Sequence, residues 1–138
     1  MTEETNNMPQ SMIHPTAIID PQAKIGAGVK IGPYAVIGPH VTIGDGTEIM
    51  AHVTIDGWTT IGKDCRFFPS CSIGSEPQDL KYHGEKSYLI IGDRSVFREF
   101  VTVSTATGEG AETRIGNDCL FQPALMWPIT ASSAITSS

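Results

Sequence analysis

Isoleucine recurs at every sixth position along more than half of this chain. Eleven consecutive positions fit the series: Ile13, Ile19, Ile25, Ile31, Ile37, Ile43, Ile49, Ile55, Ile61, Phe67 and Ile73. Glycine follows six of these positions, at Gly26, Gly32, Gly38, Gly44, Gly62 and Gly74. A period of six is neither the 3.6 residues of a helix nor the two residues of a strand. It predicts an all-β solenoid, a parallel β-helix whose coils stack on one another.

A second register supports this prediction. Four residues after each large apolar position stands a smaller residue: Ala17, Ala23, Val29, Ala35, Val41, Thr47, Val53, Thr59, Cys65 and Cys71. We expect the first and fifth places of each hexad to face inward, with β-branched residues on the flat walls. Glycine in the second place is expected because it adopts backbone angles that residues with a Cβ resist.

Three cysteines, Cys65, Cys71 and Cys119, all occupy the fifth place. There they are expected to act as small buried apolar residues and not as metal ligands or redox groups. Their odd number, without a CxxC spacing, fits a reducing compartment.

Composition restricts the possible partners. The 138 residues carry a net charge of −6, which argues against an open nucleic-acid surface. No apolar run approaches the roughly 18 residues that would span a membrane. The polar, acidic stretch from Thr2 to Asn7 does not read as a signal peptide, so a cytoplasmic location is expected.

The period divides the chain into three parts. Residues 1–11 are expected to be a disordered tail, and 12–122 a single β-helix domain. Two excursions, 75–90 and 108–114, interrupt the hexads, and after 122 the pattern ends. Loops carry function more often than the scaffold beneath them, so 75–90 is the first place to look for a site.

That loop carries a specific resemblance. The segments Gln78-Asp79-Leu80-Lys81-Tyr82, Ile91-Gly92-Asp93 and Arg98-Glu99-Phe100-Val101-Thr102 follow one another in this order. Together with His14-Pro15-Thr16-Ala17 and Gly38-Pro39-His40, they closely resemble the acyl-[acyl-carrier-protein]–UDP-N-acetylglucosamine O-acyltransferases, which begin lipid A synthesis.

The resemblance implies a left-handed parallel β-helix, a rare exception to right-handed β crossovers. It also implies a homotrimer with active sites in clefts between subunits. The implied reaction moves a 3-hydroxyacyl chain from acyl carrier protein to the glucosamine 3-hydroxyl of UDP-N-acetylglucosamine. No metal and no organic cofactor are implied.

By motif, Gln78 and Asp79 would hydrogen-bond polar groups of the substrate, and Lys81 would face the nucleotide phosphates. Tyr82 and Glu85 are expected to be loop scaffolding. Four histidines are candidates for a general base, but His14, His40, His52 and His83 do not match the family's base. Thr105 stands where many members of the family carry Arg.

The family's catalytic His belongs to a His-x-Ala-His segment that would follow Gln122, and this chain has no such segment. One permitted back-translation of residues 125–138, read in a shifted frame, spells His-Val-Ala-His-Asn-Cys-Gln-Leu-Gly-Asn-His-Val-Ile. We therefore expect 123–138 to be an aberrant, frameshifted tail on a truncated solenoid. The chain as written is expected to show little or no acyltransferase activity, because it lacks the base.

Two other hypotheses stay open at this point. The hexapeptide repeat also occurs in other acyltransferases, such as the N-acyltransferase that acts later in the same pathway. A solenoid without a catalytic His is also compatible with a non-catalytic binding or scaffold module. Binding of UDP-N-acetylglucosamine would separate the first hypothesis from this last one.

Overall fold

In the computed structural model, residues 11–75, 86–105 and 110–123 are described, and all regular elements among them are short β-strands. All sixteen strands of this part of the chain contain two to four residues. The strands are β1 (Met12–Ile13), β2 (Ile18–Ile19), β3 (Lys24–Ile25), β4 (Lys30–Ile31), β5 (Val36–Ile37), β6 (Thr42–Ile43), β7 (Glu48–Ile49), β8 (Thr54–Ile55), β9 (Trp58–Ile61), β10 (Arg66–Phe67), β11 (Ser72–Ser75), β12 (Tyr88–Ile91), β13 (Val96–Phe97), β14 (Thr102–Ser104), β15 (Glu112–Ile115) and β16 (Leu120–Phe121).

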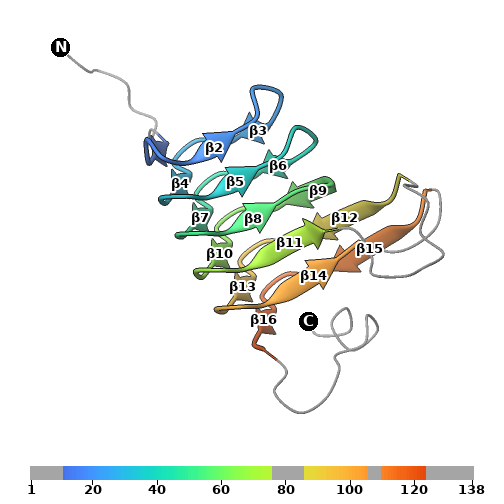
Figure 1. Ribbon diagram of the computed structural model, residues 1–138. Coiled ribbons are helices and arrows are strands. Elements are labelled where there is room, and N and C mark those ends of the chain that lie inside the picture. Colours follow the sequence, from blue (N-terminus) through green and yellow to red (C-terminus); the bar gives the residue numbers. More distant parts are fainter. Residues whose placement is uncertain (1–10, 76–85, 106–109, 124–138) are drawn as a thin grey trace.

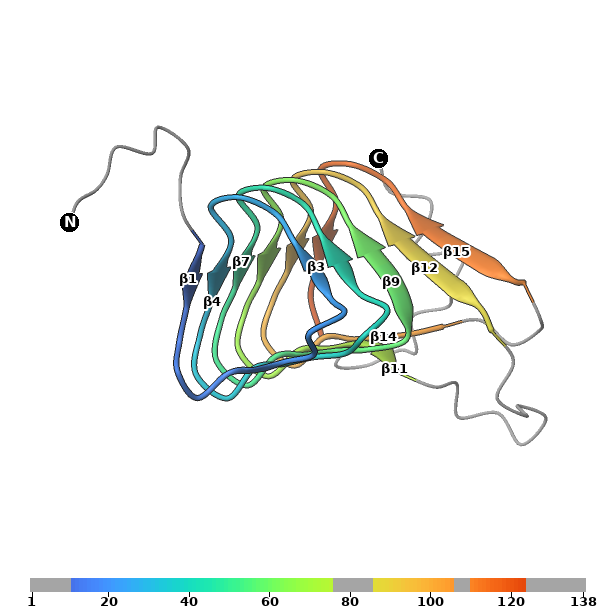
Figure 2. The same cartoon turned by 90° about the horizontal axis from the view of Figure 1, so that it is seen from above.

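The strands form three parallel sheets, which are the walls of a prism (Figures 1 and 2). Wall A has the order β1-β4-β7-β10-β13-β16, wall B β14-β11-β8-β5-β2, and wall C β15-β12-β9-β6-β3. Each strand pairs with the strand one coil away, so Met12 lies beside Lys30, eighteen residues later. Three hexads therefore complete one coil.

The interior confirms both predicted registers. From Ile31 to Phe97, the described first-place residues are almost fully buried, with Ile31 and Ile37 at 2% and 1% exposure and Phe97 at 0%. The fifth-place residues Val29 and Ala35 are equally buried, at 0%. The first coil is different because none of the described coils covers its outer side, and Ile13 stays 45% exposed.

The second-place glycines correct one expectation. Of these glycines only Gly74 has a positive φ, of 79°, so left-handed backbone is not the general reason for glycine there. The limiting factor is the stacking of coils: a Cβ on Gly44 would lie 2.5 Å from the carbonyl oxygen of Gly62. Left-handed angles occur in the fourth place, where Tyr34 and Asp64 adopt φ values of 61° and 56°.

Both excursions are shorter than predicted, because strand pairing extends into their ends. β11 continues to Ser75, and β12 begins at Tyr88, inside the predicted loop 75–90. β15 begins at Glu112, inside the predicted loop 108–114. The first residues of these strands could not be recognised in the sequence, because Tyr88 and Glu112 point outward and are not part of the inward apolar series.

Candidate functional site

The two interruptions of the repeat meet at one corner of the prism, between walls B and C. β11 and β14 end there on wall B, and β12 and β15 begin there on wall C, in successive coils (Figure 2). Backbone hydrogen bonds join the coils at this corner: Gly110 N–H donates to Lys86 O at 2.7 Å, and Thr105 N–H to Ser75 O at 3.0 Å. The residues that flank both excursions are thus held next to each other.

The floor of this corner is packed backbone. Gly74 is buried with φ of 79°, and a Cβ there would overlap the carbonyl oxygen of Asp56 in the coil below. The hydroxyl of Thr59 donates to the same oxygen at 2.7 Å. The Asp56 side chain accepts a hydrogen bond from Gly57 N–H at 2.8 Å. Because this floor is fixed, the chain leaves β11 at a defined position.

An aromatic cluster lies on wall C beside the corner. The rings of His40 and Trp58 stack with centroids 3.6 Å apart and an interplanar angle of 9°. Tyr88 meets Trp58 edge-on at 6.1 Å, and Lys86 Nζ lies 3.9 Å from the centroid of the Trp58 ring. A pocket of about 380 Å³ lies against the cluster. It is lined by Gln22, Lys24, Pro39, His40, Val41, Thr42, Trp58, Thr60 and Tyr88.

Sequence reasoning missed this cluster. A signal was present: Trp58 breaks the run of turn residues in the fourth place, and Tyr88 follows it thirty residues later. These two residues are register partners in β9 and β12. The sequence alone does not give the number of residues in the coil that contains the first excursion. Only the strand pairing defines that number, so the proximity of Trp58 and Tyr88 could not be predicted.

The predicted substrate contacts Gln78, Asp79 and Lys81 lie outside the described residues, as do Tyr82, His83 and Glu85. The structure describes the two ends of the segment that carries them, at Ser75 and Lys86. Their predicted roles therefore stay predictions, and the corner that holds those ends is the candidate site.

The described histidines have structural contacts. His14 Nδ1 lies 2.8 Å from the Thr16 hydroxyl and accepts a hydrogen bond from Thr16 N–H at 3.1 Å within its turn. His52 stacks on Tyr34 with ring centroids 5.2 Å apart, and His40 stacks on Trp58. The expectation that none of the three is a general base stays a prediction.

Thr105, where the resemblance leads us to expect Arg, is buried at 7% exposure. Its amide donates to Ser75 O, and its methyl group would lie 3.6 Å from a Cβ built on Gly57. The side chain therefore helps to pack the corner between the two coils.

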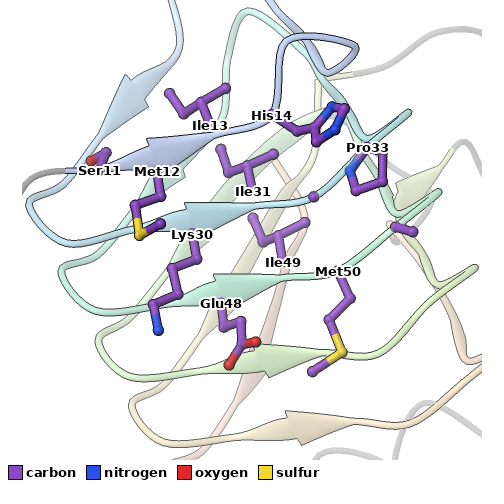
Figure 3. Close-up of a pocket in the computed structure, with 12 residues that line it drawn as sticks. Ser11, Met12, Ile13, His14, Lys30, Ile31, Pro33, Glu48, Ile49 and Met50 are labelled. Carbon is purple, nitrogen blue, oxygen red and sulfur yellow. The ribbon is translucent and has the colours of Figure 1, made fainter.

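A larger groove, of about 770 Å³, crosses β1, β4 and β7 on wall A (Figure 3). Met12, Lys30 and Glu48 line one side in successive strands, and His14 and Met50 lie on the other side (Figure 3). It holds one charge of each sign and a histidine already engaged in its own turn. This groove has no nucleophile–base pair and is remote in the chain from both excursions.

The cysteines are buried, as predicted. Cys65, Cys71 and Cys119 are interior thiols that form no disulfide. Burial raises the pKa of the Cys71 thiol to about 11 and also raises that of Cys65. Within the described ranges no three His, Cys, Asp or Glu side chains form a metal-holding group. No helix long and apolar enough to cross a membrane occurs there either.

The fold and the repeat define the class of protein to which the chain belongs. Residues 10–45 match the family model described as bacterial transferase hexapeptide (six repeats). The solenoid is thus the left-handed parallel β-helix of the hexapeptide-repeat transferases, as predicted from the resemblance.

Relatives within this class carry one name. The acyl-[acyl-carrier-protein]–UDP-N-acetylglucosamine O-acyltransferase of Chlamydia abortus is 50% identical over 111 residues, and that of Rickettsia bellii is 50% identical over 115. The solved structure of LpxA from Acinetobacter baumannii is 46% identical over 79% of this chain and 43% of its own, with a TM-score of 0.76. The acyltransferase structure from Francisella novicida is 41% identical over 80% of this chain and 41% of its own, with a TM-score of 0.77.

The chain belongs to the UDP-N-acetylglucosamine O-acyltransferase family. It is a partial member, since it spans about 40% of the length of the curated relatives that it matches.

Proposed function

We propose that the chain is a partial acyltransferase of lipid A synthesis. The family reaction transfers a 3-hydroxyacyl group from acyl carrier protein to the glucosamine 3-hydroxyl of UDP-N-acetylglucosamine. The observation that carries the proposal is the identity of about 50% to enzymes of that name across the coils. The O-acyltransferase name of these relatives favours this hypothesis over the N-acyltransferase, and no observation favours a scaffold module.

The substrate would bind at the corner between walls B and C. Gln78 and Asp79 would hydrogen-bond the sugar, and Lys81 would neutralise phosphate charge as a compact cation. The segment that carries them leaves the corner after Ser75 and returns at Lys86, both of which hydrogen-bond to the next coil. Anchored ends of this kind support accurate placement of the substrate, because catalytic geometry tolerates little displacement.

The missing general base limits the proposed activity. In the family a His would take the proton from the sugar hydroxyl, and losing a general base lowers rates by about 10²–10⁴. The alignments to the Chlamydia and Rickettsia relatives extend over 111 and 115 of the 138 residues, so part of the chain is unmatched, which is compatible with an unrelated tail over 123–138. We therefore expect substrate binding without appreciable acyl transfer from this chain.

We also propose association of three copies in the cytoplasm. The outward residues of wall B are Ile18, Val36, Thr54, Ser72 and Thr102, and none is charged. Ile18 is 66% exposed and Val36 39%. Wall A has Lys30, Glu48 and Arg66 in the equivalent places. An exposed apolar surface without charge is typical of a contact between protein subunits.

The test compares the 138-residue chain with a version whose tail is replaced by the shifted reading after Gln122, extended through the coils of a relative. Calorimetry with UDP-N-acetylglucosamine and a transfer assay with 3-hydroxyacyl carrier protein are run on both. We expect both to bind the sugar nucleotide and only the second to transfer the acyl chain. If neither protein binds UDP-N-acetylglucosamine, the proposed substrate is wrong. If the 138-residue chain transfers the acyl group, the proposed role of the missing general base is wrong.

A further inference from the structure

The indole of Trp58 lies between two parts of the chain that are distant in sequence. His40, from the turn before β6, stacks on the ring at 3.6 Å and covers one face. Lys86, the first described residue after the first excursion, places Nζ 3.9 Å from the ring centroid. Because the stacked imidazole occupies one face, the ammonium takes the other. This geometry is a cation–π contact.

The backbone around Lys86 is held from the other side. Lys86 O accepts the hydrogen bond from Gly110 N–H at 2.7 Å, and Tyr88 N–H donates to Ala111 O, also at 2.7 Å. Lys86 Nζ also lies 5.8 Å from the centroid of the Tyr88 ring. The returning arm of the excursion is thus fixed by its side chain to the coil before it and by its backbone to the coil after it.

These contacts accompany the excursions and are not general to the solenoid. On wall C, β3 and β6 have two residues each, whereas β9, β12 and β15 have four. The added residues of β9 and β12 include Trp58 and Tyr88, which face outward and are only partly buried. The core ladder of Ile61 and Ile91 is complete without them. Since the core does not need Trp58 and Tyr88, their role is to be sought in the contacts that they make at the corner.

We propose that Lys86 is a positioning residue, which docks on Trp58 and so sets where the substrate-binding segment returns to wall C. This inference rests on the proposed function, since it concerns the placement of the sugar-nucleotide site. Trp58 provides the fixed surface, and His40 holds the indole in its plane. The tyrosine edge at 6.1 Å limits rotation of the ring from the side of the next coil.

The first experiment measures the arm without ligand. Lys86→Met removes the cation from a side chain of similar length, Lys86→Arg restores it, and Lys63→Met removes a charge at the corner between walls C and A. We expect the amides of Tyr88 and Gly110 to exchange about fivefold faster in Lys86→Met, with wild-type rates in the other two variants. Unchanged exchange in Lys86→Met, or fast exchange in Lys86→Arg, overturns the proposal.

A spectroscopic readout follows the same contact. With Trp127, the second tryptophan, replaced by Phe, emission reports Trp58 alone. Lys86→Met is expected to change this emission while the melting temperature stays within about one degree, because the lysine lies outside the core. An unchanged spectrum would mean that the ammonium does not dock on the indole, and the proposal fails.

The second experiment measures calorimetric affinity for UDP-N-acetylglucosamine. We expect about fivefold weaker binding by Lys86→Met and binding within about twofold of wild type for Lys86→Arg and Lys63→Met. Faster exchange with unchanged affinity overturns the positioning role. If neither wild type nor variants bind the nucleotide, the proposed function fails, and the exchange rates and emission still decide whether Lys86 fixes the arm.

Discussion

Phe67 and Phe97 stack face to face inside the prism, with ring centroids 4.7 Å apart and an interplanar angle of 5°. Phe121 continues the stack at the same distance from Phe97, on the last described coil. Parallel register places these residues above one another, so the rings replace the isoleucines that fill the same ladder in the first three coils. The stack therefore joins the coil before the first excursion to the coils after it.

Phe97→Ala should be the most damaging of the core truncations in this ladder. Phe97 is fully buried between two rings, and Phe→Ala in a core costs about 3–5 kcal/mol of unfolding free energy. Phe97→Leu should cost clearly less, because it keeps most of the volume. Urea denaturation followed by circular dichroism gives both values. Equal losses would contradict this prediction, because they would mean that apolar volume without the aromatic ring does not stabilise this position.

Gly44→Ala should destabilise the chain although alanine is small. Its Cβ would lie 2.5 Å from Gly62 O, and overpacking of this kind costs about 1–3 kcal/mol. Gly28→Asn is the matched control: Gly28 has φ of 69°, and asparagine tolerates that conformation. The control should lose less than about 1 kcal/mol in the same urea titration. A larger loss of stability for Gly28→Asn than for Gly44→Ala would mean that backbone conformation, and not the close approach of the coils, is the main reason for glycine.

Acid should loosen the last described coil first. Arg94 makes two hydrogen bonds to the Asp118 carboxylate, at 2.8 and 3.1 Å, and these lower the pKa of Asp118 from its ordinary 3.8. A carboxylate with a lowered folded pKa stabilises above its unfolded pKa, and that contribution disappears as the pH falls through the folded value.

Hydrogen exchange of the Cys119 amide, measured from pH 6 downward against that of Val53, follows this loss. Asp118→Asn should abolish the pH-dependent difference between the two amides below about pH 4. Arg94→Lys keeps the charge without the paired geometry and should give an intermediate result. The effect should be small, since both side chains are more than half exposed. A difference that persists in Asp118→Asn would assign it to another group.

Thiol alkylation should report the folded solenoid. The thiolate is the reactive form, and burial raises the pKa of Cys71 to about 11 and that of Cys65 above its ordinary value. Iodoacetamide at pH 8 should therefore modify both residues slowly in the native chain and rapidly in urea. Peptide mass spectrometry separates the sites. Fast modification of Cys71 under native conditions would show that coils four and five open readily.

The fold could be predicted from the sequence because every wall obeys one rule. Each strand repeats the same inward and outward pattern, so Ile31 and Val29 need no knowledge of distant partners. The approximate positions of the two excursions and the burial of the three cysteines follow from that period. What the period could not provide is the reason for each glycine, since Gly44 depends on the backbone of the coil above it.

The site was less accessible to sequence reasoning. The motif drew attention to the excursion, but the contacts of Lys86 with Trp58 and of Thr105 with Ser75 join residues about thirty positions apart. Such pairs come together only when the number of residues in the interrupted coil is known from strand pairing. Predictions for Gln78, Asp79 and Lys81 rest on motif alone, because these residues lie outside the described ranges.

The spacing of strand partners shows how the two excursions fit into the repeat. Partners are eighteen residues apart where coils are regular, thirty apart from Arg66 to Val96, and twenty-four apart from Val96 to Leu120. A loop of any length could close the same corner, yet both excursions lengthen their coils by a whole number of hexads. The count of six that begins at Ile13 therefore continues unchanged past both excursions, and Ile91, Phe97, Ile115 and Phe121 all fall on it.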